Sequence, residues 1–308
     1  MNYKKYIYFL IYILIASNSY GQTNVSGTIS STTWTASDGP YIVIEDILVQ
    51  NGSTLTIEAG TTVKFLSEKQ LQVKGTLIAR GTSSSKITFT SNETNPSKGD
   101  WEYIKFFDES TDASFSGTSY TGGSIMEYCI VEYAEYGLDI SDASPFINYS
   151  EIRYNGKSGS SYDHGIGIRS QSGASPRITN CDIHNNDMGV DIYYSSSNGN
   201  FISYNTIRDN SPRGGGEVDY ATFSYNTIKN NTYSSSEGYD PAAGIKVSGG
   251  TVEHNIIHGN HSSSSRTVAS GLYIEYPDAS NNILYNNTGH SYALRFGRYW
   301  NTGNDFTD

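Results

Sequence analysis

The chain has 308 residues, with 31 Gly, 26 Tyr, only 7 Pro, and a net charge of −11. A chain this acidic is a poor general binder of nucleic acid or of an anionic membrane, because both repel it. We therefore expect no nucleic-acid partner, and the many small and polar residues favour a turn-rich architecture.

The first 21 residues are predicted to be a signal peptide. Lys4 and Lys5 precede an apolar run from Tyr6 to Ala16, and small residues follow up to Gly21. The run is too short to be a membrane span. We expect no membrane span, a mature protein that begins at Gln22, and a secreted or cell-surface location.

Residues 22–40 are predicted to be an N-terminal lead-in around Trp34. From residue 41 the sequence alternates apolar and polar residues in short runs, which indicates strands. These runs are 52–57, 60–65, 71–77, 86–90 and 101–106. Residues 107–123 are rich in Gly, Ser and Thr, and we expect them to leave the regular array as an excursion.

A six-residue box, Asn205-Thr206-Ile207-Arg208-Asp209-Asn210, recurs through the second half of the chain. The apolar centre of each copy is Val131, Ile152, Ile183, Ile207, Ile228, Ile257 or Leu284. A second pattern, Gly-apolar-x-apolar, begins at Gly137, Gly165, Gly189, Gly244 and Gly271. Two short strands per repeat of variable length predict a solenoid.

Stacked coils lie about 4.8 Å apart, so equivalent residues should form columns along the solenoid. The first Asn of each box is predicted to form one hydrogen-bonded ladder and the last Asn another. The first ladder would contain Asn205, Asn226, Asn255 and Asn282, and the second Asn186, Asn210, Asn231, Asn260 and Asn287.

Together, the two boxes resemble the repeats of right-handed parallel β-helix proteins, the pectin-lyase-like fold. The resemblance covers residues 41–306 and implies an all-β chain, a single-stranded right-handed parallel β-helix (solenoid). That fold carries lyases, hydrolases, adhesins and inert shafts, so it does not define an activity. Residues 300–306 look like the opening of another coil, so we expect either further domains beyond residue 308 or a partner that caps the last coil.

Cys129 and Cys181 occupy the same position in boxes two coils apart, with Ser150 between them. A separation of about 9 to 10 Å is too long for a disulfide, which needs Cα atoms within about 7 Å. We predict two free, inward-facing thiols.

Two outward columns could bind a ligand. The residue after each box centre is Glu132, Arg153, His184, Arg208, Lys229, His258 or Tyr285. Five consecutive basic or histidine residues (153 to 258) could grip an acidic glycan. Alternatively, they are solvated side chains partly offset by Glu151 and Asp182.

The other column is predicted to contain Asp139, Gly167, Asp191, Glu217, Lys246, Tyr273 and Arg295. Asp191 and Glu217 should be neighbours on adjacent coils. Glycoside hydrolysis requires two neighbouring carboxyl groups. Alternatively, the pair is ordinary surface charge, as such pairs often are. Lys246 could act as a base or neutralise the pair. A Ca²⁺ ion between Asp191 and Glu217 is a third interpretation.

The loops that follow the boxes should lie side by side as a fringe. They carry Tyr162, Asp163, His164, Tyr233, Tyr239, Asp240, His261 and Arg266. Tyrosine rings can stack on sugars. The alternative is a set of plain Ser/Gly connectors.

Polygalacturonase and pectate lyase motifs are missing from the sequence; Asp163-His164-Gly165 is a partial match. The leading hypothesis is therefore a secreted, non-catalytic module that binds a polysaccharide or cell-surface glycan or mediates adhesion. The glycan-binding candidates are Arg153, His184, Arg208, Lys229, His258, Tyr162, Tyr233 and Tyr239. The alternatives are a lyase or hydrolase using Asp191, Glu217, Lys246 and His164, and a passive shaft.

Overall fold

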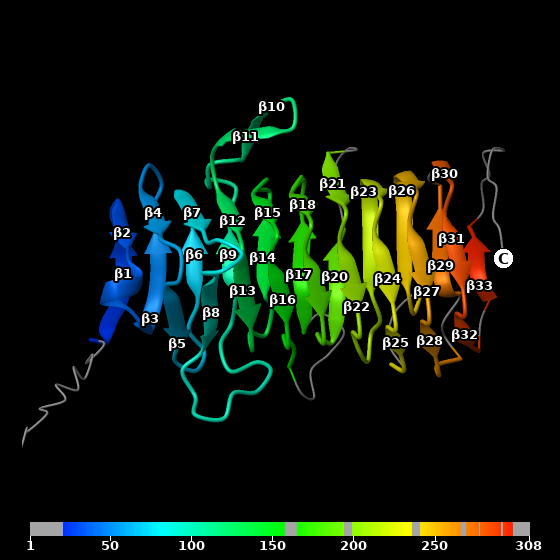
Figure 1. Cartoon of the computed structure of the whole chain (residues 1–308), viewed down its shortest axis with the longest axis horizontal. Coiled ribbons are helices and arrows are strands. Elements are labelled where there is room, and N and C mark those ends of the chain that lie inside the picture. The colour runs from blue at the N-terminus through cyan, green and yellow to red at the C-terminus, as the bar shows by residue number, and fades with distance from the viewer. Residues whose placement is uncertain are drawn as a thin grey trace, which may run out of the picture.

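The computed structural model describes residues 21–157, 165–193, 199–235, 241–265, 269–276, 278–290 and 292–297. Its strands stack along one long axis, with the N-terminal coils at one end and the C-terminal coils at the other (Figure 1). Most pairings are parallel, and each coil contributes strands to three sheets that enclose a common interior.

Sheet 1 follows the predicted box centres. It contains β1 (Thr23–Ile29), β3 (Tyr41–Val49), β5 (Thr62–Phe65), β8 (Ile87–Ser91), β13 (Cys129–Glu132), β16 (Glu151–Arg153), β19 (Asp182–His184), β22 (Thr206–Arg208), β24 (Thr227–Lys229), β27 (Ile256–His258) and β31 (Ile283–Tyr285). Ile183 pairs with Ile207 and Ile207 with Ile228, all fully buried. The predicted stacking of box centres on successive coils is confirmed.

Sheet 2 carries the Gly-apolar-x-apolar strands. Besides parts of β1 and β3, it contains β6 (Leu71–Val73), β9 (Ile104–Phe106), β14 (Leu138–Ser141), β17 (Ile166–Gln171), β20 (Met188–Ile192), β23 (Gly216–Ser224), β26 (Ile245–Glu253), β29 (Ala269–Glu275) and β33 (Tyr292–Phe296).

Sheet 3 closes each coil. It contains β2 (Thr32–Trp34), β4 (Thr54–Ile57), β7 (Thr76–Arg80), β12 (Ile125–Glu127), β15 (Phe146–Asn148), β18 (Arg177–Thr179), β21 (Asn200–Ser203) and β30 (Asp278–Ser280), with the second halves of β23 and β26. The predictions from sequence did not identify this third sheet.

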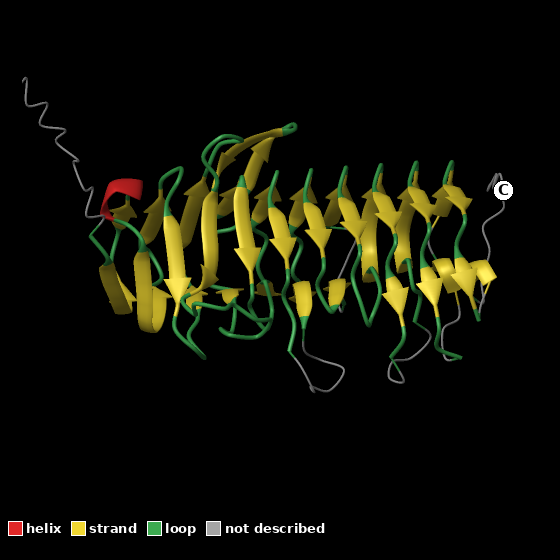
Figure 2. Cartoon of the chain, turned by 60° about the horizontal axis from the view of Figure 1, so that its bottom comes forward, coloured by secondary structure: helices red, strands yellow, loops and turns green. Residues whose placement is uncertain are grey.

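The remaining elements lie outside the three sheets. A 3₁₀ turn, η1 (Ala36–Asp38), lies near the N-terminal end (Figure 2). The predicted excursion contains an antiparallel hairpin of β10 (Ser114–Ser116) and β11 (Ser119–Gly122), which projects beside the coils. Short strands β25 (Thr232–Tyr233), β28 (His261–Ser262) and β32 (Thr288–Gly289) pair in parallel after three of the boxes.

The segment predicted to be an N-terminal lead-in, residues 22–40, is part of the β-helix. β1 pairs with β3 from Thr23 onward and β2 pairs with β4, all in parallel. The first coil therefore begins at about residue 23 and not at residue 41. Backbone pairing with the next coil organises this segment although its sequence lacks the box.

Two files of buried asparagine side chains run through the corners. In the first, each of Asn205, Asn226 and Asn255 donates from its backbone N and from Nδ2 to the Oδ1 of the next asparagine, ending at Asn282. The second joins Asn155, Asn186, Asn210, Asn231, Asn260 and Asn287 in the same way. Asn155 was not included in the predicted ladder, and it extends the file by one coil.

Both cysteines are free and buried, as predicted, with Ser150 between them. Burial raises the pKa of Cys129 well above its usual range and that of Cys181 to about 12. The two thiols therefore remain protonated at neutral pH and act as small core side chains.

We predict that Asn210→Ala lowers the free energy of unfolding by about 3 kcal/mol, because it leaves buried polar groups at the corner without hydrogen-bond partners. Asn210 Oδ1 accepts bonds from Asn186, and its Nδ2 donates to the carbonyl of Ile183 and to Asn231. Guanidinium unfolding would measure the loss. The exposed Asn95→Ala serves as the control, with a change of at most about 0.5 kcal/mol. Equal effects of the two changes would contradict the assigned role of the file.

Candidate functional site

The outward column of sheet 2 differs from its prediction at one coil. Asp139 pairs with Arg169, so Arg169 and not Gly167 occupies the column. A Cβ on Gly167 would lie 2.7 Å from the carbonyl oxygen of Gly189 and 2.9 Å from Asn186 Nδ2. The Gly-apolar pattern fits two registers here, and the packing of glycine against the asparagine side chain selects the observed one.

The corrected column alternates basic and acidic side chains over much of its length. In order, it reads Lys105, Asp139, Arg169, Asp191, Glu217, Lys246, Tyr273 and Arg295. The buried Asp139 carboxylate lies 2.8 Å from Lys105 Nζ and 3.0 Å from Arg169 Nε. Lys246 Nζ lies 3.3 Å from Glu217 Oε2. These ion pairs balance Asp139 and Glu217.

Asp191 is different, because no ion pair balances it among the described residues. Its side chain is buried, and Oδ1 has no hydrogen-bond partner. Burial, followed by the neighbouring Glu217 carboxylate, raises the pKa of Asp191 to about 8, against the opposing effect of Arg213 and Arg169. Asp191 therefore holds a proton at neutral pH.

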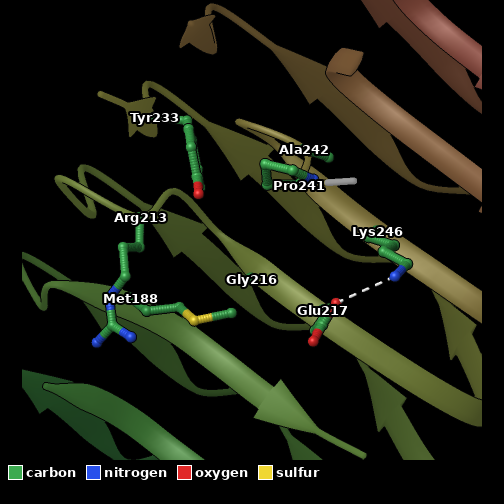
Figure 3. A pocket seen from close by; sticks show the side chains of 8 residues that line it. All are labelled: Met188, Arg213, Gly216, Glu217, Tyr233, Pro241, Ala242 and Lys246. Atoms are coloured by element: carbon green, nitrogen blue, oxygen red, sulfur yellow. Dashed lines mark ion pairs between the residues drawn. The ribbon is translucent and has the colours of Figure 1, made fainter. Parts of the chain in front are cut away.

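A small cleft has Glu217 in its lining (Figure 3). It is lined by Met188, Arg213, Gly216, Glu217, Tyr233, Pro241, Ala242 and Lys246. Burial disfavours the Lys246 ammonium, but the Glu217 carboxylate outweighs this effect and the pKa of Lys246 is raised. Lys246 therefore pairs with Glu217 as an ammonium ion, and among the described residues no ion pair joins it to Asp191.

The cleft also changes the interpretation of the loop fringe. Tyr233 is 2% exposed and lines the cleft, so it is not the free stacking surface that we expected. Its strand β25 pairs with β28 of the next coil, and Tyr233 forms an isolated bridge with Arg213. Tyr162, Asp163, His164, Tyr239, Asp240 and Arg266 lie outside the described residues, as does the predicted signal peptide up to residue 20.

The described residues place no third ligand beside Asp191 and Glu217 for the Ca²⁺ ion that the sequence analysis considered. Within the described part of the chain, no three His, Cys, Asp or Glu side chains come together in a way that could hold a metal ion. A Ca²⁺ ion takes about six to eight oxygen ligands in proteins, which is more than the carboxylates of Asp191 and Glu217 can supply by themselves.

On sheet 1, the basic column has the predicted register from Arg153 to His258. Acidic neighbours form ion pairs with several of its side chains. Arg153 pairs with Glu132 at 2.8 Å and with Glu151 at 2.6 Å, and His184 Nε2 lies 3.0 Å from Glu151.

Arg208 makes a two-pronged contact with Asp182 at 2.9 and 2.8 Å. Burial and the adjacent Lys229 lower the pKa of His258, whose ring stacks on Tyr285 at 4.6 Å. Lys229 is the one Arg or Lys of this column from Arg153 to His258 without an ion pair among the described residues. Acidic neighbours therefore offset much of the positive charge of this surface.

A third column was missed by the sequence analysis. The residue before each box lies at the corner between sheets 3 and 1, and in successive coils it is Tyr128, Tyr149, Asn180, Tyr204, Tyr225, His254 and Asn281. The backbone N of each of the first six donates to the coil above, so they are stacked in register. We call them the tyrosine column. Tyrosines immediately before two pairs of successive boxes, at 128 and 149 and at 204 and 225, were the available sequence signal.

The backbone of the tyrosine column is left-handed. φ is 49° at Tyr128, 47° at Tyr149, 62° at Tyr204 and 56° at Tyr225. Bulky residues rarely adopt this conformation, and it costs on the order of 1 kcal/mol or more per residue, whereas Asn and Gly adopt it readily. Tyrosine therefore occupies positions that local backbone preference would give to another residue.

Ring stacking accompanies this unfavourable backbone. The rings of Tyr128 and Tyr149 lie 4.9 Å apart and those of Tyr204 and Tyr225 5.0 Å apart, each pair within 6° of parallel. Tyr225 stacks in turn on His254 at 4.8 Å. Tyr149, Tyr204 and Tyr225 remain 45%, 57% and 47% exposed. The corner thus presents a rigid, exposed aromatic edge.

Comparison with known proteins agrees with the three-sheet solenoid. A family model described as "Right handed beta helix region" matches residues 127–289, more than half of the chain. The chain belongs to this right-handed β-helix family. The matched region includes every box from β13 to β31, and with it the acidic pair and the tyrosine column.

More specific similarities are limited. "Protein bark beetle" of Drosophila melanogaster is 36% identical over 78 residues, which is 25% of this chain and 2% of that protein. The chain is also similar to the crystal structure of Dettilon tailspike protein (gp208). The aligned region covers 89% of this chain and 61% of that chain, with 13% sequence identity and a TM-score of 0.31. A TM-score this low supports no functional argument. Among the described residues, no helix is long and apolar enough to cross a membrane.

We predict that Asp191→Asn makes the stability of the protein less sensitive to alkaline pH. The pKa of Asp191 is raised from 3.8 to about 8, so the bound proton stabilises the fold fully below the lower value and this contribution is lost as pH rises through the upper one. The neutral amide avoids that loss. The variant should match the wild type near pH 4 and exceed its stability by several kcal/mol near pH 9.

Thermal unfolding across this pH range measures the effect. Asp108→Asn, at an exposed loop position, is the control and should follow the wild type. A wild type more stable than Asp191→Asn at pH 9 would mean that Asp191 is stabilised as a carboxylate.

Proposed function

We propose that this protein is a secreted, non-catalytic β-helix module that binds a neutral surface glycan through the tyrosine column. The observation that carries the proposal is the column itself, in which exposed aromatic side chains occupy left-handed corners. Aromatic rings offer the C–H faces of sugars a large contact area at low cost in side-chain entropy. The interlocked coils beneath hold the rings at fixed spacing.

Electrostatics supports a neutral ligand over an acidic one. The chain carries a net charge of −11, and most of the basic column on sheet 1 is already paired with Glu132, Glu151 and Asp182. An acidic glycan would have to displace these carboxylates and approach an anionic surface. A neutral glycan faces neither cost.

The full chain should bind members of a glycan array, and Tyr204→Asn with Tyr225→Asn should weaken that binding by about tenfold or more. Asparagine already occupies the equivalent position at 180 and 281 with the same backbone conformation, so the variant retains the fold. Lys229→Glu, a charge reversal on the neighbouring face, is the matched control and should bind as the wild type does. If only the charge reversal abolishes binding, the ligand uses the basic column. A protein that binds no glycan is better described as a passive shaft.

A glycoside hydrolase is the second candidate, favoured by the protonated Asp191 beside Glu217. Hydrolysis of a glycosidic bond needs a carboxylic acid that donates a proton and a carboxylate that acts as nucleophile or base. The raised pKa of Asp191 suits the first role, and Glu217, held beside Lys246, suits the second.

This candidate predicts the release of reducing ends from a polysaccharide that the protein binds. Asp191→Asn and Glu217→Gln should each abolish release and leave binding to the tyrosine column intact. Release by the wild type that survives both substitutions would exclude this pair, and an unsaturated product would indicate a lyase instead.

A further inference from the structure

The tyrosine column has a one-coil gap. Tyr149 and Tyr204 lie on either side of Asn180, because Tyr149 N donates to the carbonyl of Thr179 and Asn180 N to that of Ser203. Neighbouring rings in the column are 4.9 to 5.0 Å apart, so Tyr149 and Tyr204 are separated by twice the coil spacing, roughly 10 Å. Asn180 contributes no ring to this interval.

The Asn180 side chain is hydrogen-bonded to the preceding coil. Its Nδ2 donates to Asn148 Oδ1 at 3.0 Å, on the preceding coil. Tyr149 stacks on Tyr128 and Tyr204 on Tyr225, so each uses one face within the column. The other face of each ring is directed at the gap, and Tyr204 is the most exposed ring of the column at 57%.

We propose that this gap is a binding slot for one pyranose ring, sandwiched between Tyr149 and Tyr204. The proposal rests on the glycan-binding function proposed above and specifies its substrate. A ring midway between the two tyrosines would lie about 5 Å from each, which is the spacing that the column's own rings adopt. The ligand thus completes an interrupted stack.

The two-sided slot selects the configuration of the sugar. Both faces of the pyranose must present C–H groups to an aromatic ring, because an axial hydroxyl directed at either tyrosine would lose its water without a hydrogen-bond partner. The β-gluco configuration has every hydroxyl equatorial and satisfies both faces. The manno configuration places the hydroxyl on carbon 2 axially, so one face of the ring directs a hydroxyl at a tyrosine.

Equatorial hydroxyls would meet polar groups at the rim of the slot. Asp182 is the first outward side chain after Asn180 on the same coil, and its carboxylate is held by Arg208. The carboxylate oxygens can accept hydrogen bonds from sugar hydroxyls, and the guanidinium can donate to them. The rim therefore suits a polyhydroxylated ring better than an apolar side chain of another protein.

Titration calorimetry of the full chain with cellotetraose and with β-1,4-mannotetraose tests the proposal. The two probes share linkage and length and differ only at carbon 2. We expect cellotetraose to bind at least about tenfold more tightly. Saturation-transfer NMR should show contact on both faces of one glucose ring. Equal affinity for the two probes, or contact on one face alone, overturns the sandwich.

Asn180→Tyr supplies the missing ring and should abolish cellotetraose binding. Tyrosine is tolerated at this backbone position in neighbouring coils, and Thr179 still donates to Asn148 Oδ1 at 2.9 Å, so the variant should fold, as circular dichroism can verify. Asn281→Tyr, which extends the column at its far end, is the matched control and should bind like the wild type.

The outcomes separate this proposal from the broader one. Cellotetraose binding unchanged by Asn180→Tyr, or array binding to other glycans without cellotetraose binding, overturns the slot and leaves the glycan-binding module standing. Absence of binding to any glycan by the wild type overturns both.

Discussion

The structure depends on the parallel hydrogen-bonded stacking of one coil on the next. A single coil of about 25 residues buries almost no apolar surface, and its backbone groups are satisfied only when a neighbour pairs with them. The asparagine files strengthen this constraint at the corners, because each amide bonds the backbone, the next side chain and a carbonyl at once. Equivalent residues are therefore forced into columns.

Column formation turns the surface into a set of parallel strips with different chemistry. Sheet 1 presents basic residues whose charge is largely taken by their neighbours, as in the pairs of Arg153 with Glu132 and Arg208 with Asp182. Sheet 2 presents alternating charges with one acid, Asp191, that remains unbalanced and protonated. The corner between sheets 3 and 1 presents tyrosines.

Departures from the repeat distinguish individual coils from their neighbours. A glycine that must lie against an asparagine side chain sets the register of β17 and brings Arg169 beside Asp139. Tyrosines at left-handed corners depart from local backbone preference, and Asn180 departs from the tyrosines. The first departure neutralises a buried carboxylate, and the last leaves one coil of the tyrosine column without a ring.

The sequence by itself determined the β-helix, the alignment of the boxes and the two unpaired cysteines, because apolar spacing and repeated Asn boxes are local signals that stacking converts directly into neighbours. The predictions of Gly167 in the outward column and of Tyr233 as a stacking surface were wrong, and the third sheet was not identified, since short patterns fit more than one alignment. Only the tertiary structure decided which charges meet, which acid keeps its proton and where the aromatic column is interrupted. These properties arise from contacts between residues roughly 20 to 30 positions apart, whose distances follow from packing of whole coils.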